Sequence, residues 1–175
     1  MSQSPKGRPY MLETTGLHRR AIVRHAAPAM VTTEELELET TMAPGFHDIT
    51  DDVLAVVADS GITFGNVTVF SSHTTCAIRI NEAEPLLLRD MARTLRQLAP
   101  SNAYYEHNDF SRRTVNMNPD ECANGHAHCQ HLFLATSETI PVIDGRPVLG
   151  TYQRIFAIEL DHPRMRRIVI SVVGC

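Results

Sequence analysis

Within residues 31–40 (VTTEELELET), acidic and apolar residues alternate through Glu35-Leu36-Glu37-Leu38-Glu39. This period of two is typical of a strand that buries one face. After a break at Pro44, Thr50 is a predicted N-cap, because its hydroxyl can accept from a free N–H group of the first helical turn. The predicted helix continues through the apolar residues 53–57 and ends at Gly61.

Two strands are predicted next, over residues 64–71 and 76–80, on either side of a short polar segment. Pro85 then opens a second helix at a position where its missing N–H costs nothing. The buried side of that helix is marked by Leu86, Leu87, Met91, Leu95 and Leu98. The other side holds a row of arginines: Arg89, Arg93 and Arg96. This row indicates a solvated helix face more simply than an anion-binding surface.

The second half of the chain begins with a polar loop over residues 100–123, and long ordered loops in compact domains usually carry function. A helix over residues 124–134 is predicted to follow. Predicted strands at residues 140–143 and 147–160 then flank Asp144-Gly145. That dipeptide predicts a β-hairpin, because both residues tolerate positive φ.

A last strand is predicted over residues 165–173. The predicted elements are therefore strands followed by helices and then a β-meander. This order predicts an α+β fold with a mostly antiparallel sheet, in a single compact domain over residues 31–175. Residues 1–29 hold five Lys or Arg and one Glu, a net charge of +4 that leaves −8 for the rest of the chain. Residues 1–30 are therefore predicted to be a basic, flexible extension, with organellar targeting as the alternative.

The composition excludes several broad classes of protein. It is 43% hydrophobic and 21% charged, and no run approaches the ~18 apolar residues that a membrane span needs. The net charge of −4 and the lack of a basic run with interleaved aromatics argue against nucleic-acid binding. The four cysteines show no CxxC spacing, which favours reduced thiols and a cytoplasmic location.

Metal-capable side chains gather in one stretch, YYEHNDFSRRTVNMNPDECANGHAHCQH, which holds four of the nine histidines. If Asn124 caps the following helix, His128 and His131 lie at i and i+3 on one face, while His126 points elsewhere. His107 in the preceding loop is then a third candidate ligand. Because neutral imidazoles bind zinc readily, this stretch is either a metal site or a set of surface histidines.

Two more groups of polar residues stand near predicted strand ends. His73, Thr74 and Thr75, with Asn81-Glu82 beyond the next strand, suit an oxyanion or phosphate cradle, or else an ordinary tight turn. Cys129 beside the histidines is a candidate metal ligand or nucleophile, although a small packed residue is the simpler interpretation.

Near the C-terminus, Gln153, Glu159 and Arg164 bring amide, carboxylate and guanidinium groups onto adjoining predicted strands. The simpler interpretation is an ion pair between Glu159 and Arg164. The chain has no GxSxG elbow, no GxxxxGK phosphate loop and no dinucleotide-binding glycine motif, which argues against those enzyme classes.

Longer motifs occur in the order HTTCAIRINEAEPLLLRDM, YYEHND, ECANGHAHCQHLFLATSETIPV, DGRPVLGTYQRIFAIELD and PRMRRIVI. Together they resemble the YjbQ-like family, whose members are often labelled secondary thiamine-phosphate synthases. The resemblance covers residues 31–174 and implies a compact α+β domain that assembles as a homotrimer.

The resemblance also implies a set of site residues. The implied metal ligands are His73, His107 and His128. The implied catalytic and substrate-orienting residues are His73, Asn81, Glu82, Gln153, Glu159 and Arg164. The chain departs from the family at Tyr152, which is usually tryptophan, at Asn108, often aspartate, and at His162, commonly glycine.

These inferences combine into one hypothesis, a metal-binding, trimeric enzyme that acts on a small phosphorylated or otherwise anionic molecule. Zinc is the expected metal, because imidazoles suit zinc better than magnesium, which prefers oxygen ligands. The same mismatch makes thiamine-phosphate synthase activity, a transferase reaction, a weak or secondary expectation. The alternatives are a metal-dependent hydrolase of a small phosphate ester and a non-catalytic trimeric protein that binds a ligand or metal.

Overall fold

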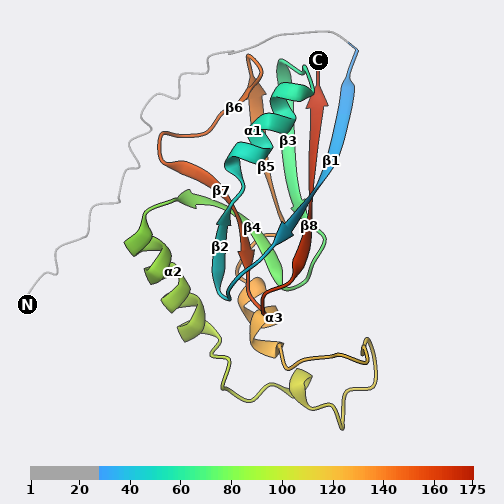
Figure 1. The fold of residues 1–175 in the computed structure, drawn as a ribbon, viewed down its shortest axis with the longest axis vertical. Coiled ribbons are helices and arrows are strands. Elements are labelled where there is room, and N and C mark those ends of the chain that lie inside the picture. The colour runs from blue at the N-terminus through green and yellow to red at the C-terminus, as the bar shows by residue number, and fades with distance from the viewer. Residues whose placement is uncertain (1–27) are drawn as a thin grey trace, which may run out of the picture.

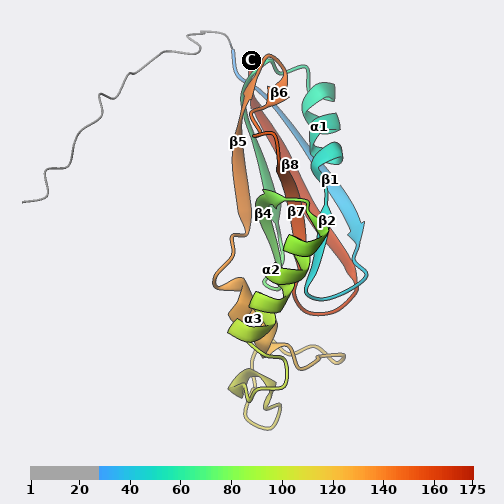
Figure 2. The same cartoon turned by 90° about the vertical axis from the view of Figure 1, so that its left-hand side faces the viewer.

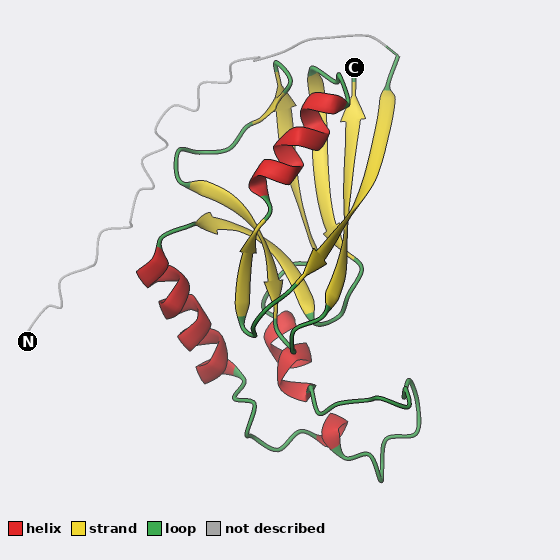
Figure 3. Cartoon of the chain, viewed as in Figure 1, coloured by secondary structure: helices red, strands yellow, loops and turns green. Residues whose placement is uncertain are grey.

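Two antiparallel sheets make up the β structure of the computed structural model, which describes residues 28–175 (Figures 1 and 3). Their neighbouring strands pair antiparallel throughout, as predicted. The large sheet has the order β1 (Met30–Glu39), β8 (Met165–Gly174), β3 (Phe64–Ser71), β5 (Ser137–Ile143) and β6 (Arg146–Pro147). The small sheet has the order β2 (Gly45–Asp48), β7 (Gln153–Glu159) and β4 (Cys76–Glu82).

Strand β1 confirms the alternation predicted for residues 31–40. Leu36 and Leu38 pack against the core, while Glu35, Glu37 and Glu39 are exposed. The strand pairs only with β8 and forms one edge of the large sheet. Charged side chains along such an edge disfavour pairing with a further strand.

The small sheet lies between two hydrophobic clusters. One face of it packs with helix α1 (Thr50–Asp59) against the large sheet, through residues such as Ile155, Val57 and Ile170. Its other face is covered by helices α2 (Pro85–Leu98) and α3 (Gly125–His131), through Phe156, Ile158 and Leu95 among others. Helix α2 stands in front of the small sheet in Figure 2. Because both faces of β7 are covered, its sequence is a continuous apolar run instead of an alternating one.

The helix starts differ from the predictions in their details. Thr50 is the first residue of α1, and Asp48 accepts from both its N–H and its hydroxyl. Helix α2 begins at Pro85 as predicted, with Glu84 accepting from two N–H groups of the first turn. Helix α3 is shorter than the predicted residues 124–134, and the Asn124 side chain makes no cap hydrogen bond.

The hairpin at Asp144-Gly145 is confirmed, with φ of 51° and 71° at these residues. The predicted strand over residues 147–160 is divided, because β6 ends at Pro147 and β7 belongs to the other sheet. Strand β4 runs through Glu82, two residues beyond its predicted end.

The predicted basic extension at residues 1–30 lies outside the described residues apart from its last three. Within residues 28–175, no helix combines the length and the apolar character that crossing a membrane requires.

Candidate functional site

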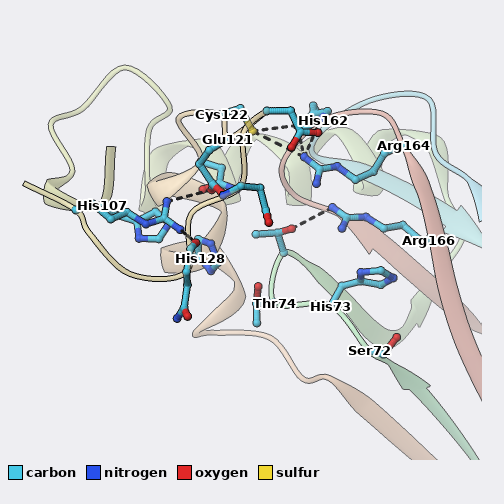
Figure 4. A pocket seen from close by; sticks show the side chains of 16 residues that line it. Ser72, His73, Thr74, His107, Glu121, Cys122, His128, His162, Arg164 and Arg166 are labelled. Atoms are coloured by element: carbon cyan, nitrogen blue, oxygen red, sulfur yellow. Dashed lines mark hydrogen bonds and ion pairs between the residues drawn. The ribbon is translucent and has the colours of Figure 1, made fainter. Parts of the chain in front are cut away.

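A polar pocket of about 710 Å³ opens at one end of the small sheet (Figure 4). Its walls come from the turn between β3 and β4, the long loop before α3, α3 itself and the segment that leads into β8. Figure 4 shows His107 and His128 on one wall and His73 on the opposite wall. His73, His107 and His128 therefore line the same cavity, but their rings do not converge on one position.

Helix α3 presents His128 to this pocket, whereas His126 and His131 are not part of its lining. The ring of His128 lies against that of His107, with centroids 4.7 Å apart and planes at 68°. Nε2 of His107 is buried and has no hydrogen-bond partner within the described part of the chain. His131 is therefore not at this pocket, and the ring that lies next to His128 is that of His107.

The His128 ring is held in its neutral form. Burial lowers the pKa of His128, and the neighbouring His107 lowers it further. A neutral imidazole keeps a lone pair that a metal or a proton can take. His107 and His128 together thus offer lone pairs from two adjacent segments.

The close approach of α3 to the preceding loop depends on Gly125. A Cβ at this position would lie 2.6 Å from Cβ of Tyr105, nearer than packed atoms approach. The Gly125 N–H donates to Oδ1 of Asn108 at 2.8 Å. Asn108 therefore holds the start of α3 and does not line the pocket.

His73 is oriented by the backbone of β8. Its Nε2 accepts a hydrogen bond of 2.9 Å from the N–H of Arg167, so the neutral ring carries its proton on Nδ1. Burial, followed by the charge of Arg166, lowers the pKa of His73. With Nε2 engaged and Nδ1 protonated, His73 suits a donor to an oxyanion better than a metal ligand.

The predicted metal set of His73, His107 and His128 is not assembled in the protomer. Within the described residues, the group of three possible ligand atoms that converge within 4.8 Å consists of Cys122, Asp161 and His162. Cys129 is exposed and does not line the pocket. The cysteine at the pocket is Cys122, whose partners Asp161 and His162 lie far along the chain.

Each arginine of the lining is paired with a carboxylate. Arg113 lies 3.0 Å from Glu121, and Arg164 lies 2.6 Å from Asp161. Arg166 forms a buried ion pair of 2.5 Å with Glu159, so the predicted pairing of Glu159 with Arg164 is wrong. Glu159 is fully buried and lies behind the pocket wall.

The remaining predicted residues lie at the far end of the small sheet. Glu82 pairs with Gln153 at one end of β4 and β7, and Cys76 pairs with Glu159 at the other. At about 3.3 Å per residue, the strand between these two pairs spans ~20 Å. Asn81 lines a separate apolar cavity of about 210 Å³ beneath α2. Within one protomer, Asn81, Glu82 and Gln153 do not reach the histidine pocket.

Comparison with known proteins agrees with this architecture. Residues 34–175 match the family model described as UPF0047 protein YjbQ-like. A UPF0047 protein of Methanothermobacter thermautotrophicus is 42% identical over 144 residues, which cover 82% of this chain and 93% of that protein. The chain belongs to the YjbQ-like family. The Bacillus subtilis protein YugU is a further relative, 34% identical over 79% of this chain and 97% of its own.

Solved structures of YjbQ-like proteins share the fold. A YbjQ-like protein of unknown function from Sulfolobus solfataricus superposes with a TM-score of 0.76 at 32% identity, over 85% of this chain and all of that one. A hypothetical protein from Aeropyrum pernix gives 0.73 at 32% identity, over 82% of this chain and 99% of its own. The predicted family and α+β fold are confirmed, and the family identity by itself assigns no reaction.

Proposed function

We propose that this YjbQ-like protein binds a divalent transition metal, with zinc expected, at His107 and His128. We propose further that it acts as an enzyme on a small phosphorylated or otherwise anionic molecule in the same pocket. The observation that carries the proposal is the adjacent pair of imidazoles, one with a buried and unpartnered Nε2. An unpaired buried nitrogen is costly, and a cation would satisfy both rings at once.

The charges of the lining favour the same conclusion. The three lining arginines are each neutralised by a carboxylate, and Asp120 adds another acid to the lining. The arginines of the described lining therefore leave no unpaired positive charge to attract a phosphate. A divalent cation on His107 and His128 supplies that charge and, when bound, polarises a phosphoryl or carbonyl oxygen.

The opposite wall supplies donors for such an anion. His73 offers Nδ1–H, and Thr74 and Thr75 line the pocket beside it. The Thr75 hydroxyl oxygen already accepts from Arg166 Nη2, which leaves its proton free to donate. Together these groups can bind and orient an oxyanion through hydrogen bonds.

Three functions use this arrangement differently. A secondary thiamine-phosphate synthase joins a thiazole phosphate to an activated pyrimidine, and the thiazole nitrogen displaces pyrophosphate. A hydrolase releases phosphate from generic esters with no second substrate, and a binding protein holds its ligand without turnover. Incubating the metal-loaded protein with thiamine precursors and with simple phosphate esters, and assaying both products, separates the three.

The metal assignment is tested first, by elemental mass spectrometry of purified wild type and His128→Ala. His126→Ala is the matched control, because His126 is on the same helix and does not line the pocket. We expect His128→Ala to lose one equivalent of metal and the metal-dependent binding of inorganic phosphate, while the control keeps both. Unchanged metal content in His128→Ala would refute the assignment.

A further inference from the structure

We propose a second metal site on the other side of this pocket, formed by Sγ of Cys122, a carboxylate oxygen of Asp161 and Nδ1 of His162. Its occupant is a borderline or soft divalent cation, of which Zn²⁺ is the type. Sulfur, nitrogen and oxygen donors in one group are the combination that selects such ions. Cys122 and His162 both line the pocket, so a fourth position is open to a ligand.

The separations of the three atoms are those of a tetrahedral site. With zinc-to-ligand distances of about 2.0–2.3 Å, tetrahedral geometry requires roughly 3.6 Å from sulfur to nitrogen, 3.5 Å from sulfur to oxygen and 3.3 Å from nitrogen to oxygen. The structure has 3.6 Å from Sγ to His162 Nδ1, 3.8 Å from Sγ to each Asp161 oxygen, and 3.1 Å from Nδ1 to Asp161 Oδ1. The ligand atoms therefore need little movement to bind.

The carboxylate is held in place for this role. The Asp161 side chain is 3% exposed, and Nδ2 of Asn124 donates to its Oδ2 at 3.2 Å. Outer hydrogen bonds of this kind orient a ligand toward its metal. Burial opposes ionisation of Asp161, but hydrogen bonds from His162 and Asn124 outweigh it and keep the pKa below its ordinary value.

A positive charge already lies at the point where the three groups converge. Nη2 of Arg164 is 2.6 Å from Asp161 Oδ2, 2.6 Å from both Nδ1 and Nε2 of His162, and 3.8 Å from Cys122 Sγ. A guanidinium can only donate, so it holds this position as a cation in place of a metal. A bound metal replaces this guanidinium, and the Cys122 thiol gives up its proton to solvent as the sulfur–metal bond forms.

Displacement gives Arg164 a second role, which rests on the function proposed for this pocket. Nε of Arg164 is buried without a partner in the described residues, and its side chain is 37% exposed. Once displaced, the side chain turns into the pocket with its charge no longer neutralised by Asp161. The second metal thereby raises the affinity of the pocket for an anion.

Cobalt(II) is the probe for this site, since a thiolate bound to cobalt gives an intense charge-transfer band in the near ultraviolet and an imidazole does not. Metal-free wild type, Cys122→Ser and the matched control Cys129→Ser are titrated with cobalt. Cys129 is exposed and does not line the pocket, whereas Cys122 and His162 do. We expect the band in wild type and in the control, and its loss in Cys122→Ser.

Two further variants make the outcome decisive. His162→Gln keeps the Cys122 thiol but lacks the imidazole ligand. We expect the affinity of this variant for cobalt, measured from the growth of the thiolate band, to fall about tenfold or more. It stands in if Cys122→Ser fails to fold, as judged by circular dichroism. His128→Ala should keep the band, so the two metal sites can fail separately. A wild-type protein without the band, or a band that survives in Cys122→Ser, overturns the second site and means that Arg164 is the permanent cation there.

Discussion

Arg166 and Glu159 form an ion pair whose side chains are only 3% and 0% exposed. Arg166 comes from β8 of the large sheet and Glu159 from β7 of the small one, so the pair joins the two sheets beside the pocket. Arg166 also donates to Thr75, and Glu159 accepts from the Thr40 hydroxyl and the Asp161 N–H. With its oxygens engaged in this way, Glu159 has a structural role and is not available to move protons for a substrate.

Replacing Glu159 by glutamine should lower the free energy of unfolding by about 3–5 kcal/mol, because Arg166 is left buried without a countercharge. Urea unfolding followed by circular dichroism measures this, since the chain has no tryptophan for fluorescence. Arg167→Met is the control, because Arg167 is 60% exposed and 3.6 Å from Glu35. That exposed pair should contribute less than about 1 kcal/mol. A Glu159→Gln protein as stable as wild type would return Glu159 to the candidates for proton transfer.

The residues of the pocket could be predicted only in part. Helical spacing associated His128 with His131, because i and i+3 share a face. Spacing carries no information about what each face of a helix packs against, and here the pocket side of α3 meets His107 from the loop. The grouping of Cys122 with Asp161 and His162 joins segments 39 and 40 positions apart. Such a group has no local signal in the sequence.

At the scale of elements, the start of α1 is stabilised from β2. Asp48, the last residue of β2, accepts from the N–H of Thr50 at 3.0 Å and from its hydroxyl at 2.6 Å. Its other oxygen accepts from Nε of Arg154 in β7 at 2.7 Å. One carboxylate therefore ties together a helix start and two neighbouring strands.

Asp48→Ala should destabilise the protein by about 1–2 kcal/mol at neutral pH, a cost similar to that of losing a side-chain acceptor at a helix start. Burial opposes ionisation of Asp48, but hydrogen bonds from Arg154 and Thr50 outweigh it and place the pKa below the ordinary 3.8. Because the folded pKa is depressed, the stabilisation is complete above 3.8 and is lost as the pH falls through the folded pKa. Urea unfolding of both proteins between pH 7 and pH 3 should show the difference shrinking at the acid end. A difference that stays constant over this range would contradict the role of the carboxylate charge.

The start of α3, at Gly125, determines where His128 lies relative to the loop that carries His107. Gly125→Ala puts a Cβ against Tyr105, so α3 must shift, with a cost of about 1–3 kcal/mol for overpacking. Because His128 moves with the helix, we expect the variant to lose metal as His128→Ala does. Gly145→Ala, at a φ of 71° with nothing within 4 Å of the added carbon, is the control. It should cost about 1 kcal/mol in the turn and leave metal content unchanged. Full metal content in a folded Gly125→Ala protein would show that α3 tolerates the shift.

Local sequence patterns predicted most helices and strands well, because each of these elements has one kind of environment along its length. The alternation in β1 indicates a strand with one buried face, and Asp144-Gly145 indicates a turn that requires positive φ. The predicted strand over residues 147–160 was wrong because its apolar run spans two sheets. Burial on both faces of β7 removes the alternation that would have marked where the strand begins.

At the scale of the whole molecule, the residues implied by the family resemblance divide between two ends. His73, His107 and His128 line the pocket, and Asn81, Glu82 and Gln153 lie ~20 Å away along β4 and β7 at the usual rise per residue. Large apolar side chains are exposed near both ends: Tyr152 beside Gln153, and Leu132 and Phe133 after α3. Exposed apolar groups of this size suit a contact between protein surfaces.

We propose that the protein forms a homotrimer in which the Gln153 end of one protomer completes the histidine pocket of the next. A head-to-tail contact between different surfaces closes into a ring when the rotation permits. Gln153 is prepared for such a role, because its Oε1 accepts from the Gly150 N–H while its amide group can still donate. Sedimentation equilibrium should give three times the mass of one 19.5 kDa chain.

Mixed trimers distinguish a shared pocket from one contained within a protomer. His128→Ala and Gln153→Ala should each weaken metal-dependent binding of inorganic phosphate when expressed alone. If each pocket takes His128 from one protomer and Gln153 from its neighbour, random mixing by co-expression should restore about one quarter of the wild-type sites. If both residues serve the same protomer's pocket, every protomer inherits one defect and mixing restores none. Calorimetry on the co-expressed protein counts the restored sites directly. A monomeric protein with full phosphate binding would remove the need for a partner, and the far-end residues would then have no part in the pocket.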